Sequence, residues 1–425
     1  MERYDVIVIG GCASGLCAAI QAARTNTDYA IAVLERMPRV GKKILATGNG
    51  RCNLSNAHTS AHPYHNADFA KHALEKYSLE KTLSFFKSLG LLTVQDSEGR
   101  LYPMSNTATS VLDVLRFETE KLGIDLLCST TVKDIKVLED GRFVVDCTQT
   151  SGTAGKTDAE KPVNVQYLAD KVIFATGGKA SPAQGSDGSG YPLLKRLGHS
   201  ITPLFPALVQ LNTANTYTKQ LKGIRVNANI SVEVNGKNKA SAKGEILFTE
   251  YGLSGIATME VSRAASEYFS GDKKGACSAV LDLAPHLSKE ELTVFLTEFI
   301  SINSELEADK LLIGILPSRV GQIVFKSSQL YDFTMPVGSL KKEQLDKLIQ
   351  TIKAFRLDIT GTRGFNQAQV TAGGIDVHEF NSSNLMSAKT DNLYACGELL
   401  DVDGGCGGFN LQWAWSSGLL AGELG

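Results

Sequence analysis

The fold is decided near the N-terminus by residues 4–35, which read YDVIVIGGCASGLCAAIQAARTNTDYAIAVLE. Tyr4 to Ile9 is a short apolar run typical of a buried β-strand, and a glycine-rich turn follows it. Leu16 to Arg24 carries apolar residues at helical spacing, and Ala30 to Leu34 is a second apolar strand that ends at Glu35. Strand, helix and strand in this order predict a βαβ unit.

The glycine-rich turn matches Gly-x-Gly-x-x-Gly in a relaxed form, with Gly10, Cys12 and Gly15 at the three positions. Small residues here let the backbone approach a pyrophosphate, and the N-terminus of the helix offers free N–H groups to the phosphates. Glu35 lies 20 residues after Gly15, where a carboxylate accepts the hydroxyls of an adenosine ribose. We therefore predict a dinucleotide-binding domain.

Three further segments indicate that the dinucleotide is FAD. Residues 41–56 (GKKILATGNGRCNLSN) form a loop too elaborate for a plain connection between a strand and a helix. Residues 173–178 (IFATGG) follow a meander of antiparallel strands over residues 133–168, an arrangement usual in flavoproteins. Residues 394–398 (YACGE) end a strand with an acid, and residues 404–410 then open a helix whose N-terminus can face the flavin.

Composition limits the function classes. The formal net charge is -2, and no block of Lys or Arg suggests a nucleic-acid surface, so we expect no nucleic-acid partner. No run is long and apolar enough to span a bilayer, and we expect a cytoplasmic protein without a membrane partner. None of the eight cysteines forms a Cys-x-x-Cys pair, and no His/Cys cluster has zinc spacing, so no metal site is predicted.

The middle of the chain changes its periodicity. From about residue 201 to 283 the pattern alternates as in strands, with an Asn235-Gly236 turn, and from about 288 to 355 it is helical. We predict an α/β fold in which a Rossmann-like FAD-binding domain is built from both chain ends and carries an inserted β-barrel-like module and an inserted helical module. The predicted boundaries are 1–195 with 372–425 for the FAD-binding domain, 196–286 with 356–371 for the β-rich module and 287–355 for the helical module.

The sequence resembles the BaiN/YhiN-like family of FAD-dependent oxidoreductases over essentially the whole chain. The segments that carry the resemblance are 43–53 (KILATGNGRCN), 244–249 (GEILFT) with 252–255 (GLSG), 371–375 (TAGGI) and 404–412 (GGCGGFNLQ). The family usually has proline after Leu-Ser-Gly, where this chain has Ile256. That difference concerns the inserted module and not the flavin site.

The resemblance implies a set of FAD contacts, to which we add residues of the glycine-rich turns. Within this set, Val132 would contact the adenine through its backbone. The predicted cofactor-binding residues are Gly10, Cys12, Ser14, Gly15, Glu35, Arg36, Lys43, Gly50, Arg51, Cys52, Val132, Thr176, Gly177, Gly397, Glu398, Asn410 and Leu411. Cys52 lacks a partner cysteine in its loop, so we interpret it as a packing or backbone contact. FAD is expected to bind without a covalent link.

The segment 185–190 (GSDGSG) resembles a phosphate-binding loop, but it follows no parallel strand of its own, and we interpret it as a structural turn. No second Rossmann motif is visible, so NAD(P)H, if it is the electron donor, would bind transiently. Tyr102 and Tyr251 are the candidate proton donors, since each lies beside a family-like segment. The sequence assigns no catalytic base and no oligomeric state.

We predict an enzyme that transfers a hydride between FAD and a small or medium-sized organic substrate. The resemblance allows an NAD(P)H-linked reductase or dehydrogenase of an enone C=C bond in a 3-oxo steroid or bile-acid-type molecule. It also allows an oxidase of amines that uses O2, similar to aminoacetone oxidase. Hypotheses of another class are an FAD-dependent tRNA-modifying protein and a flavin redox sensor without turnover.

Overall fold

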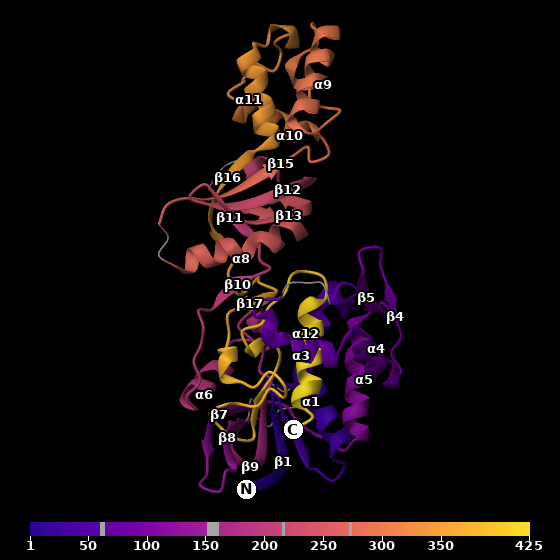
Figure 1. Ribbon diagram of the computed structural model, residues 1–425, viewed down its shortest axis with the longest axis vertical. Coiled ribbons are helices and arrows are strands. Elements are labelled where there is room, and N and C mark those ends of the chain that lie inside the picture. The colour runs from indigo at the N-terminus through magenta and orange to yellow at the C-terminus, as the bar shows by residue number, and fades with distance from the viewer. Residues whose placement is uncertain (60–63, 151–160, 215–216, 272–273) are drawn as a thin grey trace. The chain divides into compact units, whose positions relative to one another are not determined.

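The computed structural model describes residues 1–59, 64–150, 161–214, 217–271 and 274–425. The chain forms two compact units, one made of Met1–Leu204 with Gln369–Gly425 and the other of Phe205–Ala368 (Figure 1). Both chain ends therefore belong to the first unit. The predicted division into three parts, with its boundaries, stays a prediction. Among the helices of the described residues, none is both long enough and apolar enough to cross a membrane.

The described residues of the first unit contain a seven-stranded sheet. Six of its strands follow the order β6-β2-β1-β9-β8-β7, and the seventh, β18, pairs with β9. The strands β1, β2, β6, β9 and β18 run parallel, and β7, β8 and β9 form the predicted antiparallel meander. The strand bounds are β1 Glu2–Ile9, β2 Ile31–Leu34, β6 Asp125–Leu127, β7 Thr130–Val137, β8 Phe143–Gln149, β9 Val163–Phe174 and β18 Leu393–Ala395.

Helices from both chain ends pack together in this unit, because α1 near the N-terminus lies against α12 near the C-terminus (Figure 1). Added to Gly418, a side chain would meet the carbonyl oxygen of Ser14 at 2.3 Å, so glycine permits the close approach. The helices are α1 Ala13–Thr25, α2 Lys42–Ala46, α3 Ala67–Lys76, α4 Leu79–Ser88, α5 Ala108–Lys121, α6 Gly190–Arg196 and α12 Phe409–Ala421. The remaining strands are β3 Ser55–Asn56, β4 Thr93–Gln95, β5 Arg100–Pro103 and β17 Val370–Ala372.

The second unit contains a closed barrel with the order β11-β14-β13-β12-β15-β16, which confirms the β-barrel-like fold. Alternate residues of β12 are buried, as the period-two pattern of its sequence predicts. The turn between β12 and β13 has positive φ angles at Asn235 (52°) and Gly236 (73°), as expected for an Asn-Gly hairpin. The strands are β10 Phe205–Ala207, β11 Leu211–Thr213, β12 Arg225–Val234, β13 Lys237–Phe248, β14 Gly252–Ser254, β15 Cys277–Asp282 and β16 Phe355–Thr362.

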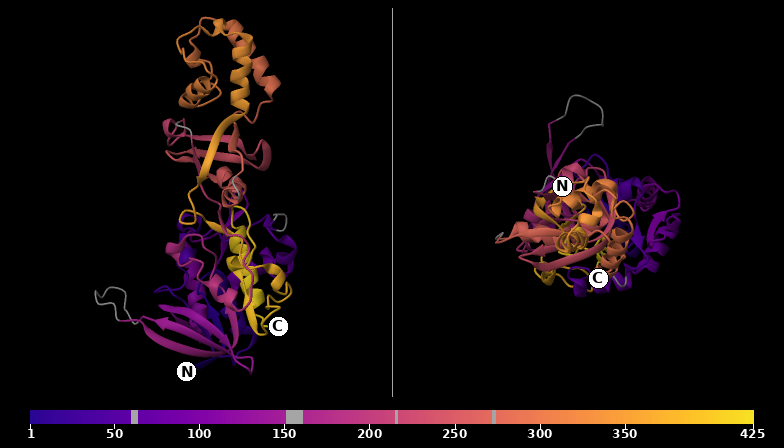
Figure 2. Two further views of the ribbon diagram at one scale, coloured as in Figure 1. Left: turned by 90° about the vertical axis from the view of Figure 1, so that its left-hand side faces the viewer. Right: turned by 90° about the horizontal axis from the view of Figure 1, so that it is seen from above.

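The helical segment of the second unit shares one buried apolar cluster with the barrel. Its helix α9 begins at a capping box, in which the Ser288 side chain and the Glu291 side chain each accept a backbone N–H of the other residue. The helices of this unit, which Figure 2 shows from two further sides, are α7 Tyr217–Gln220, α8 Ile256–Ser270, α9 Lys289–Ile302, α10 Ser318–Ser327 and α11 Lys342–Lys353.

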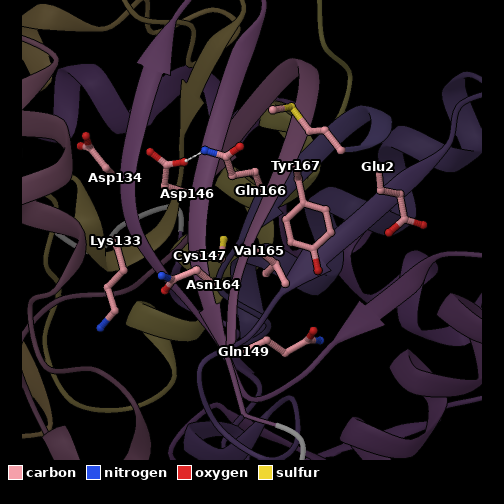
Figure 3. Close-up of a pocket in the computed structure, with 11 residues that line it drawn as sticks. Glu2, Lys133, Asp134, Asp146, Cys147, Gln149, Asn164, Val165, Gln166 and Tyr167 are labelled. Carbon is pink, nitrogen blue, oxygen red and sulfur yellow. Dashed lines mark hydrogen bonds between the residues drawn. The ribbon is translucent and has the colours of Figure 1, made fainter. Parts of the chain in front are cut away.

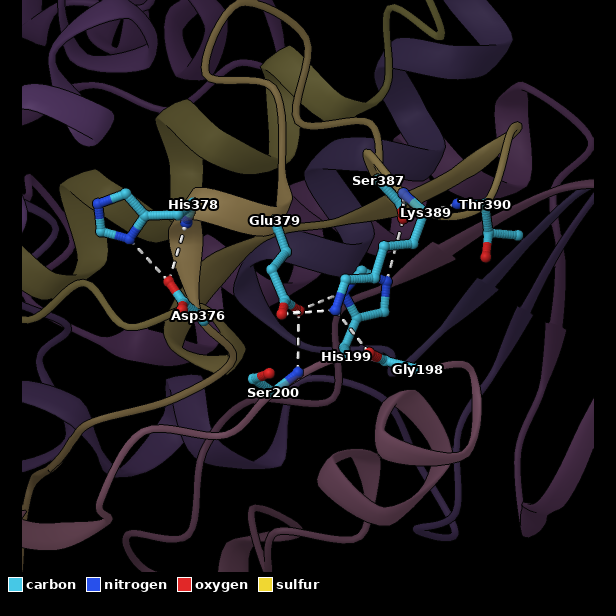
Figure 4. A network of polar contacts seen from close by, with 9 residues as sticks. All are labelled: Gly198, His199, Ser200, Asp376, His378, Glu379, Ser387, Lys389 and Thr390. Atoms are coloured by element: carbon cyan, nitrogen blue, oxygen red, sulfur yellow. Dashed lines mark hydrogen bonds and ion pairs between the residues drawn. The ribbon is translucent and has the colours of Figure 1, made fainter.

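A buried histidine network holds the segment that precedes β18 (Figure 4). The side chain of His199 is fully buried, and its Nδ1 lies 3.0 Å from Glu379 Oε2 while its Nε2 lies 3.0 Å from Ser387 Oγ. Lys389 donates a hydrogen bond of 2.6 Å to Glu379, and the His199 ring stacks on Phe380. Ser387 also accepts two backbone N–H groups, so its hydroxyl serves the turn and not a nucleophilic reaction.

The network sets the charge of its two titratable members. Burial lowers the pKa of His199, although its contact with Glu379 acts in the opposite direction. Burial alone would raise the pKa of Glu379, but hydrogen bonds from Lys389, Ser200 and His199 lower it to about 2. The resting network is thus a neutral imidazole beside a carboxylate.

Candidate FAD-binding site

The turn between β1 and α1 is shaped by two glycines that allow no side chain. Gly10 has a φ of 109°, and a Cβ there would lie 2.4 Å from the carbonyl oxygen of Ala175. A Cβ on Gly15 would lie 1.9 Å from the carbonyl oxygen of Gly10. The helix then begins at Ala13 after Cys12, whose side chain makes no capping hydrogen bond. The first N–H groups of α1 are therefore left for a ligand such as a phosphate.

Glu35 follows β2 and points its carboxylate back at this turn. The residue is 7% exposed, and its two oxygens accept N–H groups from Gly11 at 2.8 Å and Met37 at 2.7 Å. Burial raises the pKa of Glu35, and the backbone hydrogen bonds partly offset that rise. Each carboxylate oxygen accepts more than one hydrogen bond, so the group can hold the turn and still receive a ribose hydroxyl.

Two ion pairs tie distant segments to the same region. Arg36 pairs with Asp187, and Lys43 Nζ lies 2.6 Å from Glu398 Oε2. The second oxygen of Glu398 accepts the backbone N–H of Thr371 at 2.8 Å. The carboxylate that follows β18 is thus joined to the loop after β2 and to β17.

The loop after β2 contains Gly50, Arg51 and Cys52. The Arg51 guanidinium lies over the ring of Tyr102, with 4.6 Å between its carbon and the ring centroid. Cys52 is fully buried in a left-handed conformation, with a φ of 57°. Burial raises the pKa of its thiol to about 12, so the reactive thiolate is disfavoured at neutral pH. Next in sequence, the side-chain oxygen of Asn53 is buried and has no hydrogen-bond partner among the described residues.

The approach to α12 is a glycine-rich loop that Asn410 holds closed. The side-chain oxygen of Asn410 accepts the N–H of Gly404 at 2.9 Å, and its nitrogen donates to the carbonyls of Gly404 and Gly405. Gly408 precedes the helix with no side-chain cap, and Leu411 lies half-buried in the first turn. This helix N-terminus, like that of α1, therefore offers N–H groups to a ligand.

Four of the predicted residues follow the ends of parallel strands. Gly10 follows β1, Thr176 and Gly177 follow β9, and Gly397 follows β18. Hydrogen bonds between these strand ends keep them adjacent: Gly10 N to Leu34 O, Ala175 N to Ile9 O and Cys396 N to Phe174 O. Ser14 contacts Gly397, where a Cβ would lie 2.5 Å from its hydroxyl. Val132 lies on β7 in the meander.

The two tyrosine candidates fall in different units. Tyr102 is 6% exposed and belongs to the first unit, where it contacts Arg51 of the predicted flavin loop. Tyr251 belongs to the second unit, where the Arg363 guanidinium lies 4.6 Å from its ring centroid. The structure therefore associates only Tyr102 with the residues predicted to hold FAD.

Thr371 is a member of this region that residue-by-residue reasoning missed. Its hydroxyl accepts the backbone N–H groups of Lys179 and Ala180, at 2.7 and 2.9 Å, and its own N–H binds Glu398. The sequence held a signal, since Thr371 opens the family-like segment TAGGI. Lys179 and Ala180 are more than 190 positions away in sequence, so the role of the hydroxyl could not be assigned from local spacing.

The residues present fit FAD. The N-termini of α1 and α12 have no side-chain cap, and the buried side-chain oxygens of Asn53 and Thr176 have no partner among the described residues. Such groups are rarely left unsatisfied in a folded protein and indicate a polar ligand. FAD, when bound, supplies the ring system that carries a hydride.

A separate hollow of about 820 Å³ lies over the meander (Figure 3). It is lined by polar side chains, and Gln166 hydrogen-bonds Asp146 at 2.7 Å within it. The described residues that line it include none of the predicted flavin contacts, so we assign no function to it. Its lining includes Glu2, Lys133, Asp134, Asp146, Gln149 and Tyr167.

Comparison with known proteins identifies the family. The family described as HI0933-like protein Rossmann domain matches residues 4–424. The chain belongs to this family. A 3-dehydro-bile acid delta(4,6)-reductase of Clostridium scindens is 37% identical over 98% of this chain and 97% of the relative. A ribosomal RNA dihydrouridine synthase of Escherichia coli is 28% identical over 98% of this chain and 96% of the relative.

A quinol-fumarate reductase is similar in structure, with a TM-score of 0.50 at 17% identity over 99% of this chain and 70% of the other. At this identity the similarity concerns the fold alone. Family, fold and site geometry together make this HI0933-like protein an FAD-dependent oxidoreductase.

Proposed function

We propose that the protein is an NAD(P)H-linked reductase of a C=C bond conjugated to a ketone, with a 3-oxo steroid or bile-acid-type substrate. The supporting observation is the 37% identity to the Clostridium scindens 3-dehydro-bile acid delta(4,6)-reductase, which extends over nearly the full length of both chains. In the overall reaction, one hydride and one proton are added across the C=C bond, and the nicotinamide is oxidised. FAD, when bound, would supply the ring system through which the hydride passes.

The residues of this chain would bind and orient the cofactor. The N-termini of α1 and α12 offer N–H groups, Glu35 offers a carboxylate to the ribose, and the Lys43–Glu398 pair fixes the end of β18. Tyr102 is our candidate for the group that delivers the proton, because its phenol lies beside Arg51 in the same unit.

Reduction of uracil in RNA is the second candidate, supported by the 28% identity to the Escherichia coli ribosomal RNA dihydrouridine synthase. The C5=C6 bond of uracil is conjugated to a carbonyl, so the same hydride chemistry applies. Against an RNA substrate, three cations of the second unit are paired: Lys222, Lys353 and Arg356 each lie within 2.7 Å of a carboxylate oxygen. Cations paired in this way are less available to RNA phosphates.

The first test is an absorption spectrum of the purified holoprotein, recorded without oxygen before and after addition of NADH or NADPH. We expect rapid loss of the flavin band with one of the two nicotinamides. A band that persists with both, but is lost with an amine, would overturn the reductase proposal and favour the oxidase. A Tyr102→Phe variant should keep the rate of flavin bleaching and lower the rate of enone reduction about 100-fold.

RNA substrate is tested separately. Ribosomal RNA that lacks dihydrouridine should remain unchanged after incubation with the holoprotein and NAD(P)H, as measured by mass spectrometry of its nucleosides. Formation of dihydrouridine, together with no turnover of steroid enones, would replace the first candidate with the second.

A further inference from the structure

The segment from Thr176 to Tyr191 carries three hydroxyl groups that lack partners. The side-chain oxygens of Thr176, Ser186 and Tyr191 are buried, and none of them makes a hydrogen bond with the described part of the chain. Ser186 is 5% exposed and Tyr191 is 3% exposed. Among serines elsewhere whose hydroxyls are buried, Ser266 and Ser327 also lack partners within the described residues, whereas Ser262 donates to Met259 O at 2.7 Å and accepts Val209 N at 3.1 Å.

Two of the three hydroxyls lie against glycines of this same segment. A Cβ on Gly177 would lie 3.1 Å from the Ser186 hydroxyl, and a Cβ on Gly190 would lie 2.0 Å from the Thr176 hydroxyl. Tyr191 follows Gly190 directly at the start of α6. All three residues therefore belong to the segment that follows β9, the strand after which FAD contacts are predicted.

The surroundings of Tyr191 point to the same place. Burial raises the pKa of the Tyr191 phenol, and the negative charge of Glu398 raises it further. Glu398 is the carboxylate that pairs with Lys43 and receives the N–H of Thr371. Tyr191 is thus a protonated hydrogen-bond donor close to a group that we expect to contact the cofactor.

Buried hydroxyls without partners cost free energy, because each has given up its hydrogen bonds to water. Alanine, valine and phenylalanine would fill the same positions without that cost. Three hydroxyls of this kind within one short segment are therefore expected where something absent from the free chain completes their hydrogen bonds.

We propose that Ser186 and Tyr191, together with Thr176, form a hydrogen-bonding wall of the FAD site and donate to oxygen atoms of the cofactor, either phosphate oxygens or ribityl hydroxyls. This gives the Gly185–Gly190 segment a binding role in place of a purely structural one. The inference rests on FAD binding by this family and is independent of the substrate.

The test compares FAD affinity with the stability of the apoprotein in Ser186→Ala and Tyr191→Phe. FAD is titrated into apoprotein and followed by flavin fluorescence, and urea unfolding of the apoprotein is measured in parallel. Each variant should weaken FAD binding about tenfold, the loss of one hydrogen bond. The urea midpoint of the apoprotein should stay the same or rise, since a costly hydroxyl has been removed.

Two variants with satisfied hydroxyls serve as controls. Ser262→Ala in the second unit and Tyr77→Phe, whose hydroxyl donates to Glu423 at 2.7 Å, should lower the urea midpoint and leave FAD affinity unchanged. The inference is overturned if Ser186→Ala and Tyr191→Phe behave like these controls. The two hydroxyls would then contribute only to packing or bind buried water, and not FAD. Normal FAD binding without enone reduction would instead overturn the proposed function alone.

Discussion

Glu35 and Glu379, two carboxylates of the first unit, have opposite electrostatic surroundings. Glu35 is buried, its oxygens accept only backbone N–H groups from the described residues, and its pKa is raised by burial. Glu379 is held by the ammonium of Lys389 and by His199, and its pKa falls to about 2. The carboxylate that accepts a hydrogen bond from a lysine is satisfied within the fold, whereas the one whose hydrogen bonds with the described residues come from backbone amides retains capacity for a further partner.

This difference separates a structural acid from a binding acid. Glu379 links the segment before β18 to the segment after α6, and all its strong contacts are internal. Glu35 closes the turn between β1 and α1, where a dinucleotide is expected. Substitution of each acid should therefore affect stability and FAD binding in different proportions.

The largest effect is expected from Glu35→Ala, which leaves the N–H groups of Gly11 and Met37 without an acceptor. We expect a loss of about 3 kcal/mol in the free energy of unfolding and at least a roughly 100-fold loss of FAD affinity. Urea unfolding of the apoprotein and FAD titration measure the two effects. An unchanged FAD affinity would mean that Glu35 only closes the turn.

Glu379→Ala should reduce stability without reducing FAD affinity. The variant loses contacts to Lys389, His199 and the Ser200 N–H, and we expect about 2 kcal/mol less free energy of unfolding. FAD affinity, measured by titration below the unfolding transition, should stay within about threefold of the original. A loss as large as that of Glu35→Ala would erase the distinction between the two acids.

The smallest effect concerns pH. His199 has a lowered pKa in the folded protein. Its contribution to the free energy of unfolding is therefore complete above its pKa in the unfolded chain, about 6.5, and is lost as the pH falls below that value. The stability difference between the wild type and His199→Gln should change by up to about 1.4 kcal/mol per pH unit below pH 6.5. Glu35, whose pKa is raised, changes stability with pH in the opposite direction, but it is present in both proteins, so its effect cancels in the difference. Equal slopes for His199→Gln and the wild type would show that His199 does not titrate in this range.

How much the sequence predicts depends on whether a feature is local. Gly10, Gly15 and Glu35 could be placed because strand, turn and helix follow one another and the acid ends the next strand. The Asn235-Gly236 hairpin was predictable for the same reason. The alternation in β12 predicted a half-buried strand, but the strand order of the barrel depends on pairings between distant segments.

The contacts that were not predictable join residues far apart in the chain. His199 meets Glu379 across 180 positions, and Thr371 binds Lys179 across 192. No spacing rule connects such residues, because the fold alone brings them together. The unpartnered hydroxyl of Tyr191 was likewise invisible in the sequence, since only burial distinguishes it from an ordinary helical tyrosine.

The central claim is the proposed reduction of a C=C bond conjugated to a ketone, and it is tested most directly in the absence of oxygen. Holoprotein whose flavin band has been bleached with dithionite is mixed with a 3-oxo-4-ene steroid, and the band is followed while products are analysed by mass spectrometry. The account predicts rapid return of the band with one product that is two mass units heavier per flavin. A band that stays bleached with steroid enones but returns with oxygen would contradict the claim.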